Sequence, residues 1–117
     1  MIKLIVAGSR DYTNKERVFK SIDTVNSFYD GDIEIVSGLA RGPDTLGKLW
    51  AQSNNKALHE FPADWDRYGK SAGYKRNEQM ATFADVLLAF WNGKSPGTSH
   101  MINLAKKYGL KVVVVRV

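Results

Sequence analysis

Glycine, serine and threonine gather at three points where an apolar run ends, a pattern typical of phosphate-binding loops. Gly8-Ser9-Arg10 follows the first run, Ser-Gly-Leu-Ala-Arg-Gly-Pro-Asp fills positions 37–44, and Trp-Asn-Gly-Lys-Ser-Pro-Gly-Thr-Ser fills positions 91–99. Glycines let the backbone approach a ligand closely, and the first turn of a following helix offers free amides to an anion. One such loop is weak evidence, but three at successive strand ends indicate a ligand that carries phosphate.

The candidate ligand-binding residues come from these loops and from the pair Arg76-Asn77, which lies between the second and third loops. They are Gly8, Ser9, Arg10, Ser37, Gly38, Arg41, Gly42, Asp44, Arg76, Asn77, Trp91, Gly93, Ser95, Gly97 and Thr98. Some of them also have a purely structural explanation, because a simple turn needs small residues and Asp44 can complement a helix dipole. In the empty site, Arg10 or Arg41 is the expected ion-pair partner of Asp44.

Other common chemistries find no support in the residues. Gly93-Lys94-Ser95 resembles the end of a Walker loop, but no glycine precedes Gly93 by five positions, and no G-x-G-x-x-G fingerprint occurs. His59 and His100 lie far apart, with no Glu or Cys at zinc spacing, so we expect no metal. No Ser-His-Asp set can be recognised, and no cofactor is expected.

Residues 62–76 combine aromatic and charged side chains and admit two interpretations. Trp65, Tyr68 and Tyr74 stand among acidic and basic residues that include Lys75 and Arg76. In a nucleotide site, one of these aromatic rings stacks on the base while the two cations meet phosphate. The simpler alternative is a loop whose aromatic side chains cover the edge of the sheet.

Apolar runs and helical spacings alternate along the chain and predict the elements that position these residues. We expect strands at 2–7, 33–36, 57–61, 86–91 and 111–115, and a helix at 75–83 after a loop at 62–74. A capping box at Thr13–Glu16 should start the first helix and Pro43 the second. The second helix should face the core with Leu46, Leu49, Trp50 and Ser53, and Thr98 should cap a last helix over 101–108.

Strands so apolar and so free of alternation are typical of parallel sheets covered by helices on both faces. The order of elements predicts an α/β fold: a Rossmann-like, doubly wound sandwich around a five-stranded parallel sheet in the order 3-2-1-4-5. In that order the first and fourth strands end side by side at the switch point, where such folds bind ligands. The three loops should meet there.

The composition fits one globular domain over residues 1–117. A hydrophobic share of 44% with 25% charged residues argues against disorder. No apolar run reaches membrane-spanning length, a strand from Ile2 leaves no room for a signal peptide, and cysteine is absent, so we expect a cytoplasmic location. The net charge of +5 suits an anionic partner, although scattered basic residues fit a solvated surface equally well.

Four motifs in order resemble a known family. Gly8-Ser9-Arg10, Ser-Gly-x-Ala-Arg-Gly-x-Asp at 37–44, Arg76-Asn77-x-x-Met80 and Trp-x-Gly-x-Ser-x-Gly-Thr at 91–98 resemble the YspA (cpYpsA-related) branch of the SLOG superfamily. That superfamily joins the Smf/DprA DNA-processing proteins with the LOG-type phosphoribohydrolases. The resemblance runs from the first strand to the last. It implies a Rossmann-like domain that binds nucleotides or nucleotide-derived ligands, and a homodimer whose interface the sequence does not reveal.

The resemblance also bears on catalysis. LOG enzymes cleave the N-glycosidic bond of a nucleoside 5′-monophosphate with an Arg, a Gly-x-Gly-Thr phosphate loop and a Glu three residues after that Thr. Arg76 and Gly97-Thr98 match the first two features, but Met101 stands at the position of the Glu. A thioether can neither stabilise an oxocarbenium-like centre nor accept a proton, so Met101 disfavours this activity. Glu78, Asp44 or Asp11 would have to substitute.

These observations rank three functions. The favoured one is binding or sensing of a nucleoside monophosphate or an ADP-ribose-like compound through the strand-end loops. The first alternative is an N-glycosidic hydrolase with a non-standard acid, for which Arg76 is the best catalytic candidate. The second alternative is a DprA-like single-strand DNA binder. It is less favoured because the basic residues are not clustered in one tract and because the further domains of DprA proteins are missing. The expected partner is therefore a nucleotide-like small molecule before nucleic acid, with no membrane partner.

Overall fold

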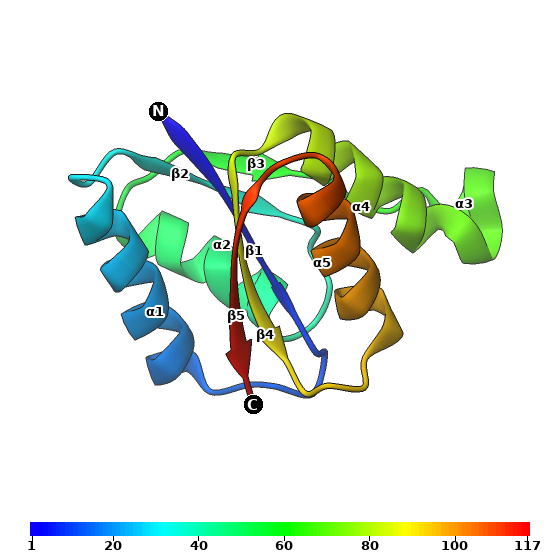
Figure 1. The fold of residues 1–117 in the computed structure, drawn as a ribbon, viewed down its shortest axis with the longest axis horizontal. Coiled ribbons are helices and arrows are strands. Elements are labelled where there is room, and N and C mark those ends of the chain that lie inside the picture. Colours follow the sequence, from blue (N-terminus) through cyan, green and yellow to red (C-terminus); the bar gives the residue numbers. More distant parts are fainter.

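The five strands form one parallel sheet, which confirms the predicted fold class and strand order. The computed structural model describes residues 1–117, and its sheet runs β3-β2-β1-β4-β5. The strands are β1 (Ile2–Gly8), β2 (Ile33–Ser37), β3 (Leu58–Glu60), β4 (Val86–Trp91) and β5 (Lys111–Arg116). β1 pairs with β4 up to Gly8 and Phe90 (Figure 1), so these two strands end together at the switch point.

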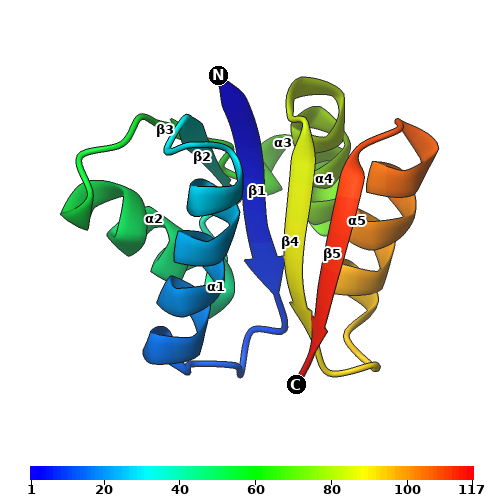
Figure 2. The same cartoon turned by 60° about the vertical axis from the view of Figure 1, so that its left-hand side comes forward.

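Four helices cover the two faces of the sheet. Helices α1 (Lys15–Phe28) and α2 (Pro43–Ser53) lie on one side, and α4 (Ala72–Phe83) and α5 (Pro96–Lys107) lie on the other, as Figure 2 shows. The short helix α3 (Trp65–Tyr68) and a 3-10 turn, Gly69–Ser71, lead into α4. None of the helices combines the length and the apolarity that crossing a bilayer requires.

The alternation of side chains along β1 divides the interior into two cores. Leu4 and Val6 pack with buried residues of α1 and α2, Trp50 among them. Ile5 and Ala7 point to the opposite face and pack with α4 and α5. Burial of each large side chain contributes about 1.5–3 kcal/mol, so both helix layers are held to the strands that carry the loops.

Two helix starts differ from the prediction. The α1 helix begins after Asn14, whose Oδ1 accepts the hydrogen bond of Arg17 N at 3.1 Å, so Asn14 and not Thr13 caps it. The α5 helix begins at Pro96, with Ser95 before it, so Thr98 lies in the first turn and is not the cap. The proline explains the earlier start, because it needs no amide partner at the first helical position.

The prediction of a loop over 62–74 is wrong from Trp65 onward. Asp64 Oδ1 accepts from Arg67 N at 3.1 Å and starts α3, and α4 begins at Ala72 instead of Lys75. Aromatic and charged residues without an apolar stripe hide this helical stretch from a periodicity argument.

Two predicted core faces are also wrong in part. Trp50 is buried as expected, but Leu49 is 40% exposed and Ser53 is exposed, because Gly47 and Ala51 face the sheet instead. β5 is not buried on both faces either: its Val113 and Val114 are 36% and 38% exposed. β5 is one of the two edge strands and pairs with β4 alone, so its apolar run reflects strand formation more than burial.

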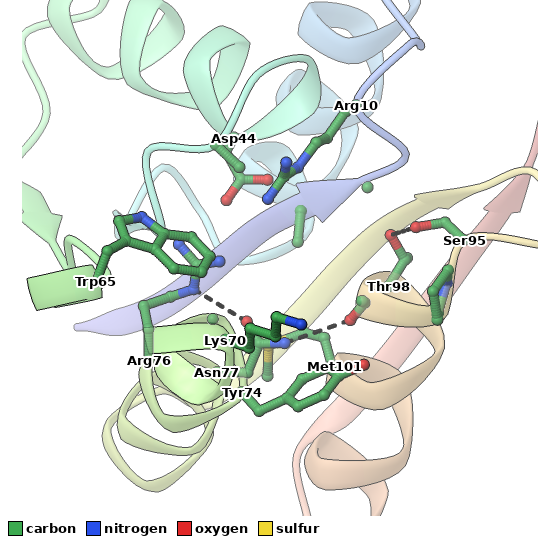
Figure 3. A pocket seen from close by; sticks show the side chains of 16 residues that line it. Arg10, Asp44, Trp65, Lys70, Tyr74, Arg76, Asn77, Ser95, Thr98 and Met101 are labelled. Carbon is green, nitrogen blue, oxygen red and sulfur yellow. Dashed lines mark hydrogen bonds between the residues drawn. The ribbon is translucent and has the colours of Figure 1, made fainter. Parts of the chain in front are cut away.

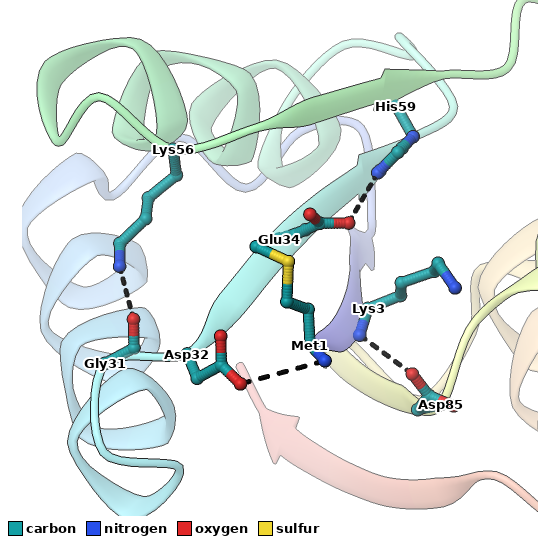
Figure 4. A network of polar contacts seen from close by, with 8 residues as sticks. All are labelled: Met1, Lys3, Gly31, Asp32, Glu34, Lys56, His59 and Asp85. Atoms are coloured by element: carbon teal, nitrogen blue, oxygen red, sulfur yellow. Dashed lines mark hydrogen bonds and ion pairs between the residues drawn. The ribbon is translucent and has the colours of Figure 1, made fainter.

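At the opposite end of the sheet, a polar network fixes the amino ends of the strands (Figure 4). Asp85 Oδ2 accepts from Lys3 N at 2.9 Å, and His59 Nε2 lies 2.8 Å from Glu34 Oε1 across β3 and β2. These side chains bond to partners within the network, at the end of the sheet away from the strand-end loops. They therefore have a structural explanation and leave the carboxyl edge as the candidate site.

Candidate functional site

The loops after β1, β2 and β4 meet α4 around one cavity of about 350 Å³ at the carboxyl edge of the sheet (Figure 3). Small, polar and cationic residues make up most of its wall. The lining residues are Ala7, Gly8, Arg10, Ala40, Asp44, Trp65, Lys70, Gly73, Tyr74, Arg76, Asn77, Ser95, Pro96, Gly97, Thr98 and Met101. The cavity therefore joins all three predicted loops to one helix from a different part of the chain.

Arg76 anchors the wall that α4 contributes. Its side chain is 8% exposed, its Nη1 donates to Gly38 O, and its Nε donates to Asn77 Oδ1 at 3.1 Å. Burial lowers the pKa of the guanidinium, while the nearby carboxylate of Asp44 raises it and the positive charge of Arg10 lowers it. Arg10, Asp44 and Arg76 thus form one electrostatic group with two positive charges and one carboxyl.

Asn77 connects Arg76 to the first turn of α5. With its Oδ1 accepting from Arg76, its Nδ2 faces Gly97 O at 3.3 Å and His100 Nδ1 at 3.2 Å. Because an amide nitrogen only donates, Nδ1 of His100 is the acceptor and its ring is neutral. Burial lowers the pKa of His100, which agrees with that neutral form.

Asp44 is the carboxylic acid of the cavity wall. It lies in the first turn of α2 and is 4% exposed. Desolvation raises its pKa to about 6, although the charge of Arg76 and the backbone amides of Ala40 and Gly38 act in the opposite direction. Neither Arg10 nor Arg41 forms an ion pair with Asp44 within 4.0 Å, so that expectation is wrong; Arg76 is the cation that acts most on it.

The loop after β4 presents an open helix end to the cavity. Asn92 Oδ1 accepts from the amides of Lys94 and Ser95, both at 2.8 Å, which shapes the turn before Pro96. The first backbone hydrogen bond of α5 runs from Ser99 N to Ser95 O. The amides of Gly97 and Thr98 come before this bond in the chain, so they have no acceptor within the helix. A Cβ at Gly97 would have no atom within 4 Å, so the first turn of α5 is open beside Gly97, which lines the cavity.

Two aromatic side chains border the cavity from α3 and α4. Trp65 is 53% exposed and Tyr74 is 47% exposed, and Tyr74 packs on the ring of His100 with centroids 4.3 Å apart. Trp65 also lines a second hollow, which shares Arg10, Ala40 and Arg76 with the first. Exposed rings beside a polar cavity are available for stacking on a planar ligand group.

The structure brings part of the predicted site together and separates the rest. Lining the cavity are Gly8, Arg10, Asp44, Arg76, Asn77, Ser95, Gly97 and Thr98. Gly38 and Arg41 line the second hollow. Ser9, Ser37, Gly42, Trp91 and Gly93 line neither.

Those outer residues build the loops instead. Ser9 Oγ accepts from Asn92 N at 3.1 Å and ties the first loop to the third. Ser37 Oγ donates to Asp44 O at 2.9 Å, and Trp91 Nε1 donates to Ser95 O at 3.2 Å. A Cβ at Gly93 would meet the guanidinium of Arg116, outside the cavity.

Ala7, Ala40, Gly73 and Pro96 also line the cavity, although they are not among the predicted site residues. For Gly73 a signal exists, because it lies three and four positions before Arg76 and Asn77 and so shares their face of α4. Met101 lines the cavity and is 1% exposed. Glu78 and Asp11 are exposed and line neither hollow, so of the three suggested substitutes for the missing Glu only Asp44 faces the cavity.

Comparison with known proteins identifies the family. A sequence model described as the YspA, cpYpsA-related SLOG family (YAcAr) matches residues 2–68, more than half of the chain. The chain belongs to this family. The matched part of this SLOG protein contains the loops after β1 and β2, and Arg76 and Gly97-Thr98 follow it in the sequence.

One relative and one solved structure extend the comparison over 97% of the SLOG chain. The Gene 61 protein of Mycobacterium phage D29 is 33% identical over 119 residues, covering 97% of this chain and 95% of the relative. The solved structure of DNA processing protein A (DprA) from Streptococcus pneumoniae matches with a TM-score of 0.74 at 20% identity. That match covers 97% of this SLOG protein but 49% of the DprA chain, so the likeness shows a common fold with about half of that protein.

Proposed function

We propose that residues 1–117 act as one ligand-binding domain and bind a nucleotide or a nucleotide-derived phosphate compound in the cavity. One observation carries this proposal: the open amino end of α5 and the guanidinium groups of Arg10 and Arg76 face the same cavity. Helix amino ends and arginines are the groups that proteins use to hold phosphate. Membership of the SLOG family and the shared fold with DprA support a nucleotide- or DNA-related role in general.

The positions of the side chains support a particular orientation of such a ligand. A phosphate group fits the α5 side, which offers the amides of Gly97 and Thr98 and the hydroxyls of Ser95 and Thr98, whose oxygens lie 3.2 Å apart (Figure 3). In this orientation the base lies beside the exposed rings of Trp65 and Tyr74, which border the cavity. The cavity volume of about 350 Å³ suits a ligand of mononucleotide size.

A thermal-shift screen tests the binding function. The compounds are nucleoside monophosphates, NAD, ADP-ribose, inorganic phosphate and a short single-stranded oligonucleotide. A ligand at 100 times its dissociation constant adds about 2.7 kcal/mol of stability, which raises the melting temperature of a domain of this size by about 10 °C. If no phosphate compound shifts the melting temperature, the binding function is wrong.

A pair of arginine variants then locates the binding site. We expect Arg10→Ala to weaken binding about tenfold, because it removes one of the two guanidinium charges that line the cavity and attract an anionic ligand. The matched control is Arg17→Ala, since Arg17 is exposed on α1 and lines neither hollow. Equal loss in both variants would indicate a general charge effect and would argue against this cavity.

N-glycosidic hydrolysis is a second candidate, favoured by the carboxyl of Asp44 in a cavity where Met101 occupies the usual Glu position. Water would replace the base at C1′ of the ribose, which releases free base and ribose 5-phosphate. Incubation with nucleoside monophosphates, followed by chromatography of the free base, tests this activity. Release that Asp44→Asn abolishes would establish an enzyme, and absence of release from every monophosphate would leave binding alone.

Single-strand DNA binding is a third candidate, favoured by the second hollow, to which Arg41 adds a further cation beside Arg10 and Arg76. The solved relative with the same fold is named as a DNA processing protein. Titration with the oligonucleotide at several salt concentrations tests this candidate, because each phosphate contact adds to the slope of affinity against salt. A shallow slope or absent binding would exclude it.

A further inference from the structure

The carboxyl of Asp44 has no side-chain donor in the protein, although it is almost entirely buried. The residue is 4% exposed, none of the side-chain hydrogen bonds ends on its carboxyl oxygens, and no ion pair reaches it within 4.0 Å. It nevertheless lines the cavity, on the α2 side in Figure 3 and away from Ser95 and Thr98. The backbone amides of Gly38 and Ala40 already act on this carboxyl. Because two carboxylate oxygens can accept about four hydrogen bonds, acceptor capacity remains on the side that lines the cavity, where a ligand can supply donors.

The local structure holds this carboxyl in place. Ser37 Oγ donates to the backbone oxygen of Asp44 at 2.9 Å, and Pro43 fixes the start of α2. A Cβ at Gly38 would lie 2.9 Å from Asp44 Oδ2 and 2.8 Å from Arg76 Nη1. Glycine at this position therefore leaves room for the carboxyl and the guanidinium together at the cavity wall.

The chemistry of the carboxyl restricts what part of a ligand can face it. A phosphate carries only acceptors and negative charge at neutral pH, so Asp44 disfavours phosphate next to itself and favours it at the α5 side. The sugar lies between phosphate and base in a nucleotide, and its vicinal hydroxyls offer two donors to the two carboxyl oxygens. An acidic side chain that accepts from ribose hydroxyls is an established device of nucleotide-binding α/β folds.

We propose that Asp44 accepts hydrogen bonds from the 2′- and 3′-hydroxyls of the ligand and makes the cavity selective for ribonucleotides over 2′-deoxyribonucleotides. The proposal rests on the proposed binding function and adds the class of sugar to it. It also opposes the DNA-binding candidate, because DNA lacks the 2′-hydroxyl.

The test measures a ratio of affinities. AMP, GMP, CMP and UMP are titrated calorimetrically, and the monophosphate that binds most tightly is compared with its 2′-deoxy and 3′-deoxy forms. We expect each deoxy form to bind about tenfold more weakly, the loss expected for one hydrogen bond to a charged group. In Asp44→Asn and Asp44→Ala, the ratio between ribo and 2′-deoxy affinities should fall to within about threefold.

The outcomes separate this proposal from the binding function. Equal affinities for the ribo and deoxy forms in the wild-type protein overturn the role of Asp44 and leave nucleotide binding intact. An unchanged ratio in both Asp44 variants assigns the selectivity to another group and also overturns it. If no monophosphate binds, both proposals fail. Glu78→Gln is the matched control, since Glu78 is an exposed carboxylate outside the cavity and its removal should leave the ratio unchanged.

Discussion

Arg76 Nε donates a 3.1 Å hydrogen bond to Oδ1 of its neighbour in sequence, Asn77. This bond orients the amide of Asn77 so that its Nδ2 faces Gly97 O and His100 Nδ1. Since Arg76 Nη1 also donates to Gly38 O, two adjacent residues of α4 connect the loop after β2 to the first turn of α5. The cavity thus has a fixed wall before any ligand arrives.

Replacement of Asn77 tests this connection. In Asn77→Ala, Arg76 Nε loses its acceptor in a buried setting, so the free energy of unfolding should fall by about 1–3 kcal/mol. Nucleotide affinity should fall about tenfold, because both the guanidinium and the end of α5 lose their support. Urea denaturation and calorimetric titration measure the two effects. Gln79→Ala, an exposed change in the same helix, should alter neither, and a wild-type affinity in Asn77→Ala would contradict the connection.

The stability of the protein should depend on pH through Asp44. Burial raises the pKa of its carboxyl from 3.8 to about 6, so the folded state binds a proton more tightly than the unfolded chain does. Protonation of this carboxyl therefore adds to the free energy of unfolding. The contribution is complete below about pH 4, and up to about 3 kcal/mol of it is lost as the pH rises through 6.

Comparison with Asp44→Asn isolates this contribution from the other carboxyls. Relative to the wild type, the variant should become more stable as the pH rises from 4.5 to 6.5, and the difference should then stay constant. Urea denaturation of both proteins at a series of pH values measures it. A difference that does not vary with pH would show that the carboxyl of Asp44 keeps an ordinary pKa in the folded protein.

Gly97→Ala should separate stability from binding. The new Cβ meets no atom within 4 Å, and alanine is a better helix former than glycine by about 1 kcal/mol, so the melting temperature should not fall. The methyl group would project into the open space beside Gly97 at the cavity wall, so nucleotide affinity should drop, more so in Gly97→Val. Retained affinity in both variants would place the phosphate elsewhere.

Gly38→Ala should disturb the cavity wall by crowding the side chains of Arg76 and Asp44. Its Cβ would lie within 3 Å of both Arg76 Nη1 and Asp44 Oδ2, so one of these side chains must move. We expect a loss of about 1–3 kcal/mol in unfolding free energy together with weaker binding. Gly73→Ala provides the stability control, because its Cβ would make an ordinary 3.6 Å contact with Trp65. Equal stability of the two variants would argue against the crowding at Gly38.

Local patterns were enough to predict the sheet. Strands such as Val86–Trp91 are apolar throughout and are separated by helical segments, and only a few topologies satisfy the handedness of parallel connections. The loops after β1, β2 and β4 could therefore be assigned to one edge of the sheet. The start of α3, which Asp64 caps, and the exposed valines of β5 could not be predicted. The short helix α3 has no apolar stripe, and the exposure of β5 follows from its edge position in the sheet, which no sequence period reveals.

Within the site, the sequence by itself determined the small and polar residue types of the three strand-end loops. It also determined that Met101 stands where LOG enzymes have Glu. Only the tertiary structure decided which of those residues share a cavity. Gly97 and Arg76 line the cavity, whereas Ser9 and Trp91 hold the loops in place through hydrogen bonds. The tertiary structure also changes the character of Asp44, since a carboxyl acquires a pKa of about 6 only when packing removes water from it, and packing joins segments far apart in the chain.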